Sequence, residues 1–398
     1  MRHAAYVVNT GVITAIGNDT QACKNALIQS RSGISIATYL QTHWKDELPV
    51  GEVKLSNEEL AVMCGADVRW PRTALLSAIA VKEAWQPYKD KATGLRVSFF
   101  SANTVGGMDI TEAFYKDYKT DPHTSDVSRI ANHECGAVTE LVSAHFNIHD
   151  FVTTISTACS SSANSIMLAT QMIAAGIIDV AIAGGADSLS RFTLNGFNTL
   201  MILDKQPCQP FDQNRRGLNL GEGAGYVLLM NEQAMKQCNA TAICIVSGYA
   251  NANDAYHQTA SSPEGTGNKL AMQGALDRAG LQPSNIDYIN LHGTGTANND
   301  SSEGKAIEAI FGSSIPRASS TKAFTGHTLG ACGGVEAVFS ILSIRDGIIF
   351  PNLRWQTQME DVNFKPVTEL ETGRNIRHVL SNSFGFGGNC SSLILSKC

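Results

Sequence analysis

The stretch TTISTACSSSANSIMLATQMIAAG, residues 153–176, sets the pattern that the rest of the chain repeats. Its β-branched beginning predicts a buried strand over 151–157. Its Ser- and Ala-rich continuation predicts a helix over 160–175 that stops at Gly176. A second strand pattern, DVAIAGGAD at 179–187, follows at once. A strand, a long helix and another strand are typical of a βαβ unit with parallel strands.

The same alternation continues on both sides of this unit. Further strands or helices are predicted at 4–13, 72–85, 96–102, 225–231, 242–254, 268–281, 286–293, 302–312, 333–347 and 378–388. Such an order predicts an α/β fold with a largely parallel sheet that helices cover on both faces. Because the two halves follow a similar order, we expect a duplicated core. The polar stretch NEQAMKQCNAT places the boundary near residue 235, which gives halves 1–235 and 236–398.

Composition excludes several classes of protein. The chain has 398 residues, of which 43% are hydrophobic and 17% charged, so it is not a disordered chain. Its net charge of −6 and the absence of a long basic run argue against a nucleic-acid partner. The ten cysteines contain no CxxC pair, which favours a reducing, cytoplasmic location. The most apolar region, MIAAGIIDVAIAGGA, is interrupted by Asp179, so we expect no membrane span.

Cys159 is the first candidate for chemistry. It falls where the strand over 151–157 gives way to the start of the helix. A thiol at a helix N-terminus lies near the positive end of the helix dipole, which predicts a lowered pKa and a thiolate nucleophile. The same N–H groups can hold an oxyanion. The alternative is a buried structural cysteine, the usual fate of this residue type.

Two histidines lie in Gly-rich motifs of the second half. His292 ends a strand in LHGTGTANNDSSEGKAIEAIFG (291–312), where Thr294 and Thr296 offer hydroxyl groups. His327 follows Lys322 in STKAFTGHTLGACGGVEA (320–337), which lacks the GK[ST] of a phosphate-binding P-loop. Either histidine could instead be a loop residue bonded to backbone.

Two further hypotheses concern a metal and a gate. A zinc site of Cys159, His292 and His327 is possible in principle, but no close-spaced ligand pair exists, so we expect no metal. In SNSFGFGGN (381–389), Phe384 and Phe386 alternate with glycines. They are either packed core aromatics or a mobile gate beside a pocket.

Together, these motifs resemble a known family. TACSSSA, LHGTGTANND, STKAFTGHTLGACGGVEA and NSFGFGGN occur in this order in the type II β-ketoacyl-acyl-carrier-protein synthases, ketosynthases of the thiolase superfamily. FDQNRRGLNLGEGAGYVLL (211–229) is also similar to that family. The resemblance covers nearly the whole chain. It implies the thiolase fold, in which two αβαβαββ halves form a five-layered α-β-α-β-α body that usually pairs in a dimer.

The resemblance also implies roles for single residues. Cys159 would carry the acyl chain as a thioester, with the N–H groups of Cys159 and Phe386 as the oxyanion hole. His292 and His327 would drive decarboxylation of malonyl groups. Lys322 would order the two histidines, with Glu303 as the carboxylate partner of this lysine. Thr294 and Thr296 would hold the phosphopantetheine arm. Phe386 would gate the site, with Phe384 beside it.

Three further positions are assigned by the same resemblance. Arg69 and Arg72, in VRWPRTALL, lie where related enzymes carry basic residues that dock the acidic carrier protein; ordinary surface charge is the alternative. Val105 corresponds to a position at the far end of the acyl pocket, with ordinary core packing as the alternative.

The implied reaction joins an acyl chain on Cys159 to malonyl-acyl-carrier-protein in fatty-acid elongation. No metal or organic cofactor is implied beyond the phosphopantetheine of the carrier protein. The alternative pathway is polyketide or aryl-polyene synthesis, which Ser160-Ser161-Ser162 favours. The partner would be an identical subunit or a homologous chain-length-factor subunit. Asn219, Asn389 and Cys390 depart from the usual family pattern. A degradative thiolase would need a second catalytic cysteine in a CxGxG-like loop, which Cys390 does not provide, and a non-catalytic subunit would lack Cys159.

Overall fold

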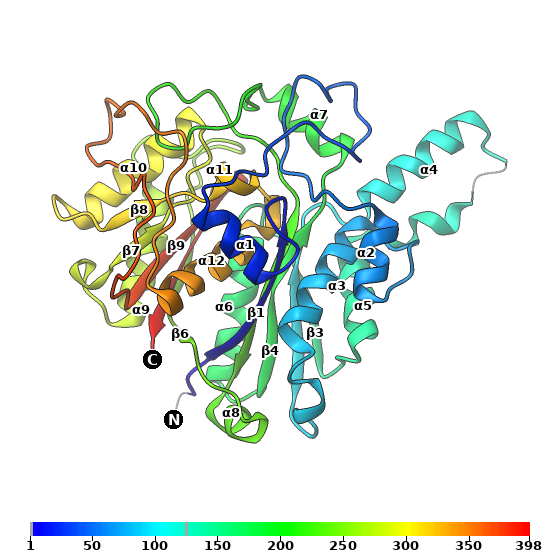
Figure 1. The fold of residues 1–398 in the computed structure, drawn as a ribbon, viewed down its shortest axis with the longest axis horizontal. Coiled ribbons are helices and arrows are strands. Elements are labelled where there is room, and N and C mark those ends of the chain that lie inside the picture. The colour runs from blue at the N-terminus through cyan, green and yellow to red at the C-terminus, as the bar shows by residue number, and fades with distance from the viewer. Residues whose placement is uncertain (1–2, 124–125) are drawn as a thin grey trace.

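The structure is a computed structural model that describes residues 3–123 and 126–398. Two sets of five strands dominate it (Figure 1). The first set is β1 (Tyr6–Thr14), β2 (Val97–Ala102), β3 (Phe151–Ile155), β4 (Val180–Asp187) and β5 (Gly223–Met230). The second set is β6 (Cys244–Asn253), β7 (Tyr288–Asn290), β8 (Arg317–Ser319), β9 (His378–Gly385) and β10 (Asn389–Lys397).

The two sets repeat one topology. The strand order is β3-β2-β4-β5-β1 followed by β6-β10-β9-β7-β8. If the strands of each set are numbered one to five along the chain, both sets have the spatial order 3-2-4-5-1 from the outer edge inward. β2 pairs parallel with β3 and β4, and β7 pairs parallel with β8 and β9. The sets meet where Tyr6 and Val7 of β1 pair with Ile245 and Cys244 of β6.

The expectation of a largely parallel sheet is wrong. Of the nine strand pairings in the described part of the chain, four are parallel and five antiparallel. The last two strands of each set pair antiparallel with each other, β4 with β5 and β9 with β10. Antiparallel neighbours need no crossover helix, so an alternation of strands and helices does not reveal them.

Helices complete five layers. The central layer holds α6 (Ser161–Ala174) and α12 (Cys332–Asp346), whose side chains share one core with strands of both sets. One outer layer comprises α2 (Asn57–Cys64), α3 (Arg72–Trp85) and α5 (Cys135–Phe146). The other comprises α9 (Thr266–Ala279) and α10 (Ala297–Phe311). Figure 1 shows these layers from left to right, which confirms the predicted α-β-α-β-α body.

The remaining helices lie around this body. They are α1 (Thr20–Ile28), α4 (Met108–Thr120), α7 (Arg191–Thr199), α8 (Glu232–Cys238) and the short α11 (Lys322–Thr325). α4 has no buried residue and projects from the body in Figure 1. Among the described residues, no helix combines the length and apolar character that crossing a membrane requires. The central helices α6 and α12 begin close together. The Cys332 thiol at the start of α12 donates a hydrogen bond to the backbone carbonyl of Cys159, just before α6.

Candidate active site

The turn between β3 and α6 presents Cys159 at its tip. Ala158, just before it, has φ +53°, a left-handed conformation that L-residues rarely adopt. The following serines fix the turn: Ser160 Oγ donates to Thr157 O at 2.7 Å and Ser161 Oγ donates to Ala158 O at 2.6 Å. The serine run therefore braces the loop that carries the thiol. Cys332 Sγ adds a bond to the carbonyl of Cys159 at 3.1 Å.

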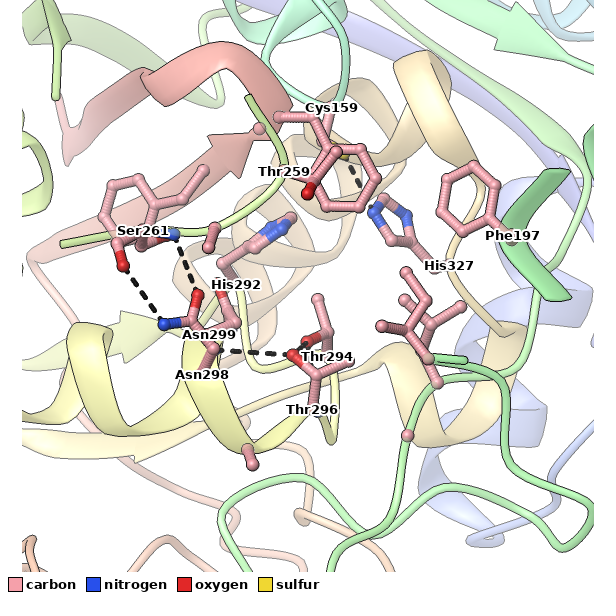
Figure 2. A pocket seen from close by; sticks show the side chains of 18 of the residues that line it. Cys159, Phe197, Thr259, Ser261, His292, Thr294, Thr296, Asn298, Asn299 and His327 are labelled. Atoms are coloured by element: carbon pink, nitrogen blue, oxygen red, sulfur yellow. Dashed lines mark hydrogen bonds between the residues drawn. The ribbon is translucent and has the colours of Figure 1, made fainter. Parts of the chain in front are cut away.

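The Cys159 sulfur meets two donors. His327 Nε2 lies 3.0 Å from it, as Figure 2 shows, and the Phe386 backbone N–H also points at it. The expected low pKa of this thiol is wrong. Burial raises the pKa of Cys159 to about 11, although the Lys322 ammonium and the Phe386 N–H oppose the rise. α6 begins only at Ser161, and the thiol lies 7% exposed in a desolvated pocket, so burial outweighs the helix dipole.

Hydrogen bonds fix which nitrogen carries the proton in both histidines. His327 Nδ1 accepts from the Leu329 N–H at 3.2 Å, and His292 Nδ1 accepts from Lys322 Nζ at 3.1 Å. Each neutral ring therefore carries its proton on Nε2. Burial and the Lys322 charge lower the pKa of both imidazoles well below the usual value, so they are neutral donors at pH 7. The two rings meet edge to face with centroids 5.4 Å apart.

Glu336, and not Glu303, is the carboxylate partner of Lys322. Lys322 Nζ lies 2.5 Å from Glu336 Oε1 and 2.5 Å from the carbonyl of His292. Burial opposes the charge of this lysine, but Glu336, Cys332 and Glu303 together outweigh burial and raise the pKa of Lys322. Glu303 instead accepts from the N–H groups of His292 and Gly293, both at 2.8 Å. Glu303 therefore positions the backbone of the histidine turn. The sequence could not rank two carboxylates whose distances to Lys322 depend on the fold.

A cavity of about 280 Å³ opens beside the thiol. It is lined by Cys159, Phe197, Met201, Ile202, Arg216, Gly217, Leu218, Thr259, Ala260, Ser261, His292, Thr294, Thr296, Ala297, Asn298, Asn299, His327, Phe384, Gly385 and Phe386. Thr294 and Thr296 face each other across a 2.9 Å hydrogen bond on its wall (Figure 2). Phe384 packs against the His292 ring, with centroids 6.0 Å apart. The cavity therefore joins the thiol, both imidazoles and two hydroxyl groups.

The loop that carries Phe386 is held by Asn389, one of the departures from the family pattern. Asn389 Nδ2 donates to the Phe386 carbonyl at 3.0 Å. The ring of Phe386 stacks on Phe197, with centroids 5.6 Å apart and planes at 19°. Cys390 is buried and donates to Asn268 Oδ1 at 3.2 Å, away from this loop. Asn219, the third departure, accepts from the Cys208 N–H at 2.7 Å.

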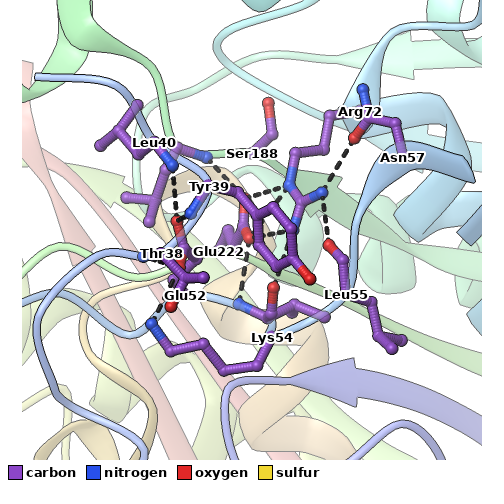
Figure 3. Close-up of polar contacts among 12 residues, drawn as sticks. Thr38, Tyr39, Leu40, Glu52, Lys54, Leu55, Asn57, Arg72, Ser188 and Glu222 are labelled. Atoms are coloured by element: carbon purple, nitrogen blue, oxygen red, sulfur yellow. Dashed lines mark hydrogen bonds and ion pairs between the residues drawn. The ribbon is translucent and has the colours of Figure 1, made fainter. Parts of the chain in front are cut away.

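Arg72 is not available as a docking residue. Its side chain is buried and forms an ion pair with Glu222 at 2.7 Å, as Figure 3 shows. It also donates to the carbonyls of Val53 and Leu55. Position 72 therefore joins α3 to the preceding loop. Arg69 is different, because its side chain is 86% exposed and pairs with Asp67 at the surface.

Val105 lies outside the lining of the cavity. It is buried in an apolar cluster with Leu189, Leu218 and Leu329, and its N–H donates to Asp187 Oδ1 at 3.1 Å. Phe197 and Ile202 pack against the same cluster and also line the cavity. Val105 thus belongs to an apolar cluster that reaches the cavity through Leu218, Phe197 and Ile202, but it does not line the cavity itself.

The thiol and the two histidines could be taken for a metal site, since their donor atoms lie within 4.8 Å of one another. A histidine binds a metal through a ring nitrogen that has a free lone pair. In both rings the Nδ1 lone pair already accepts a hydrogen bond, and Nε2 carries the proton. The donor set therefore suits an anionic oxygen or sulfur better than a cation.

Asp300, which lies in the motif over 291–312, accepts from the N–H groups of Thr294 and Gly295. Two other groups of this site were not predicted from the sequence. They are Glu336, which binds Lys322, and Asn382, whose Nδ2 donates to Glu303 at 3.1 Å. A signal existed for Glu336 alone, since it is an isolated carboxylate in the apolar stretch GGVEAVFSILSI.

Comparison with known proteins agrees with this site. The sequence matches the description "Beta-ketoacyl synthase, N-terminal domain" over residues 5–234 and "Beta-ketoacyl synthase, C-terminal domain" over residues 243–356. The 3-oxoacyl-[acyl-carrier-protein] synthase 2 of Staphylococcus aureus (strain COL) is 30% identical, over 98% of this chain and 97% of that protein. The enzyme of that name from Rhizobium meliloti (strain 1021) is 37% identical, over 79% of this chain and 76% of that protein.

Solved structures of ketosynthase complexes also superpose on this chain. The structure titled "The ishigamide ketosynthase/chain length factor" superposes with a TM-score of 0.93 at 26% identity, over 100% of both chains. The ketosynthase ApeO in complex with its chain length factor ApeC, from Xenorhabdus doucetiae, superposes with a TM-score of 0.85 at 29% identity, over 100% of this chain and 98% of that chain. The chain therefore belongs to the β-ketoacyl synthase family of acyl-transferring condensing enzymes.

Proposed function

We propose that this chain catalyses the decarboxylative condensation of an acyl chain, held on Cys159, with malonyl-acyl-carrier-protein. The observation that carries the proposal is that Cys159 lies beside two neutral imidazoles, each with a proton on the Nε2 atom. Two such donors stabilise an enolate oxygen better than a neutral thioester, and that difference lowers the barrier.

The first half-reaction loads the enzyme. The Cys159 sulfur attacks the carbonyl of the incoming acyl thioester, and the thiol proton passes to the departing carrier thiol. The oxyanion that forms is held by the backbone N–H groups of Cys159 and Phe386. The carrier leaves, and the acyl chain stays on Cys159 as a thioester.

The second half-reaction forms the carbon–carbon bond. The malonyl carboxylate leaves as CO2, and its bonding electrons pass into an enolate whose oxygen accepts from His292 and His327. The enolate carbon then attacks the acyl carbonyl on Cys159. The Cys159–acyl bond breaks, and the sulfur takes up one proton from solvent, which balances the loss of the malonyl carboxylate as CO2. The β-ketoacyl chain leaves on the carrier. The phosphopantetheine arm belongs to the substrate, with Thr294 and Thr296 as its supports, and these steps use no other cofactor.

Purified enzyme should convert an acyl primer and malonyl-carrier to one β-ketoacyl product, detected as a mass increase on the carrier. The Cys159→Ala variant should form no such product. If the wild type forms none with any primer of two to sixteen carbons, the proposed reaction is wrong.

A polyketide-type pathway is a second candidate, because two ketosynthase/chain-length-factor structures superpose over the whole chain. In that case the partner is a homologous subunit that lacks the nucleophile, instead of a second copy. Mass spectrometry of the acyl group on Cys159 in cells separates the two pathways. A saturated chain supports fatty-acid elongation, and a conjugated chain supports the alternative. Since all ten cysteines are unpaired, we place the enzyme in the reducing cytoplasm.

A further inference from the structure

Arg216 is the one permanently charged side chain among the described residues that line the active-site cavity. Its side chain is 58% exposed, whereas Cys159 and both catalytic histidines are buried. Arg216 therefore lies at the mouth of the cavity and the reacting groups lie at its floor. A substrate that enters this cavity passes the guanidinium before it reaches the thiol.

The Arg216 guanidinium is held by Asp204 through only some of its N–H groups. Arg216 Nη2 lies 3.1 Å from Asp204 Oδ1, and its Nε donates to Asp204 Oδ2 at 3.3 Å. Asp204 is buried, so this carboxylate is a fixed anchor for one edge of the guanidinium. The N–H groups on Nη1 have no partner among the described contacts. A planar guanidinium that keeps free N–H groups suits the oxygens of a phosphate.

The preceding residue shows a contrasting arrangement. Arg215 is buried, and it donates to the carbonyls of Thr296 and Ala297 and to Ser301 Oγ. These bonds, with one from Arg215 Nη1 to the Asp212 carbonyl, tie Arg215 to the start of α10 and to its own loop. Of the two consecutive arginines, only Arg216 lines the cavity.

The wall near Arg216 adds further groups that suit an anion. The Ser261 hydroxyl has no partner among the described contacts, although the Ser261 N–H donates to Asn298 Oδ1 at 2.8 Å. Ala297 and Asn298, also on this wall, are the first residues of α10. The positive end of a helix increases the local attraction for negative charge.

We infer that Arg216 binds the phosphate group of the carrier's phosphopantetheine arm while the thioester end of the arm reaches Cys159. The inference rests on the proposed function, because that reaction defines the arm as the substrate. The arm has its thioester at one end and its only charge, the phosphate, at the other. The cavity has its thiol at the floor and its only fixed charge at the mouth, so the two match end to end.

The experiment compares two small substrates that differ only in the phosphate, S-malonyl phosphopantetheine and S-malonyl pantetheine. CO2 release gives kcat and KM for the wild type and for Arg216→Gln. We expect the variant to raise KM for the phosphorylated substrate about tenfold, the effect of losing one charge-assisted hydrogen bond. KM for the other substrate and both kcat values should stay unchanged. Arg216→Lys, which keeps the charge, should restore part of the loss.

Lys205→Gln is the matched control. Lys205 is an exposed cation beside Asp204 that pairs with Glu47 and does not line the cavity. If both variants raise KM for the phosphorylated substrate equally, general surface charge is responsible and the inference is wrong. The inference is also wrong if Arg216→Gln raises KM equally for both small substrates, for neither, or only for malonyl-carrier protein. If the wild type releases no CO2 from either substrate or from malonyl-carrier protein, the proposed reaction itself fails.

Discussion

The Nε2 atom of His327 lies 3.0 Å from the sulfur of Cys159, while Nδ1 of the same ring accepts from the Leu329 N–H. The ring therefore donates toward the sulfur and has no free nitrogen to take the thiol proton. Since burial also raises the pKa of Cys159 to about 11, the resting nucleophile is a thiol. It loses its proton only as the acyl group is transferred.

This protonation state predicts the order of cysteine labelling. At pH 7 we expect iodoacetamide to modify the exposed Cys398 first and Cys159 slowly, because only a thiolate reacts and a raised pKa leaves little of it. Labelling of Cys159 should accelerate as pH rises toward about 11. Peptide mass spectrometry follows both sites, and Cys159→Ala is the control. Rapid labelling of Cys159 at pH 7 would show a resting thiolate instead.

His292→Ala and His327→Ala should separate the two half-reactions. Each removes one of the two donors proposed for the enolate, so decarboxylation should fall about 100- to 1,000-fold. Acylation of Cys159 should remain measurable, because the oxyanion hole proposed for that step consists of backbone N–H groups. CO2 release and the intact mass of the acylated enzyme report the two steps. Full decarboxylation by either variant would remove that histidine from the mechanism.

Glu336→Gln should harm the enzyme more than Glu303→Gln. The first change leaves the buried Lys322 ammonium without its counter-charge, which typically costs about 3–5 kcal/mol of unfolding free energy. It should impair both half-reactions, as should Lys322→Ala. Glu303→Gln loosens only the turn at His292 and Gly293 and should reduce decarboxylation selectively. Urea unfolding measures the loss of stability, and the acylation and decarboxylation assays measure the two half-reactions. A larger loss in Glu303→Gln than in Glu336→Gln would contradict this prediction.

Arg72→Met should act on stability. It breaks a buried ion pair and strands the Glu222 carboxylate, which typically costs about 3–5 kcal/mol. KM for the carrier substrate should stay unchanged in the protein that remains folded. Arg69→Glu is the matched test of docking, since Arg69 is exposed on the same segment. A raised KM for carrier-bound substrate, with no change for malonyl pantetheine, would support docking at Arg69.

Val105→Phe should shorten the longest acyl chain that Cys159 accepts. The larger ring needs room in an apolar cluster against which Phe197 and Ile202 of the cavity lining pack. Overpacking of this kind also costs about 1–3 kcal/mol of stability. Acyl-carrier substrates of graded length, saturated and conjugated, give the profile for both enzymes. Val105→Ile is the milder control, and an unchanged profile in Val105→Phe would show that position 105 has no part in chain length.

Local sequence determined much of this protein. Cys159 stands in a Ser-rich turn, and His292, Lys322 and His327 stand in Gly-rich motifs. All four follow the ends of strands, and the structure brings them together. Helix and strand periods predicted most elements, and the similar halves predicted a duplicated core. The five layers were implied by the resemblance to the β-ketoacyl synthases. The division at residue 235 stays a prediction.

Tertiary structure decided what depends on contacts between distant segments. Lys322 pairs with Glu336 instead of Glu303 because α12 turns the Glu336 carboxylate toward α11. Arg72 is buried because Glu222, 150 residues away, meets it. The pKa of Cys159 rises because the surrounding layers exclude water, a long-range effect that overrides the local helix dipole. A motif fixes which groups are present, but only the packing of the whole chain fixes their partners and their charge.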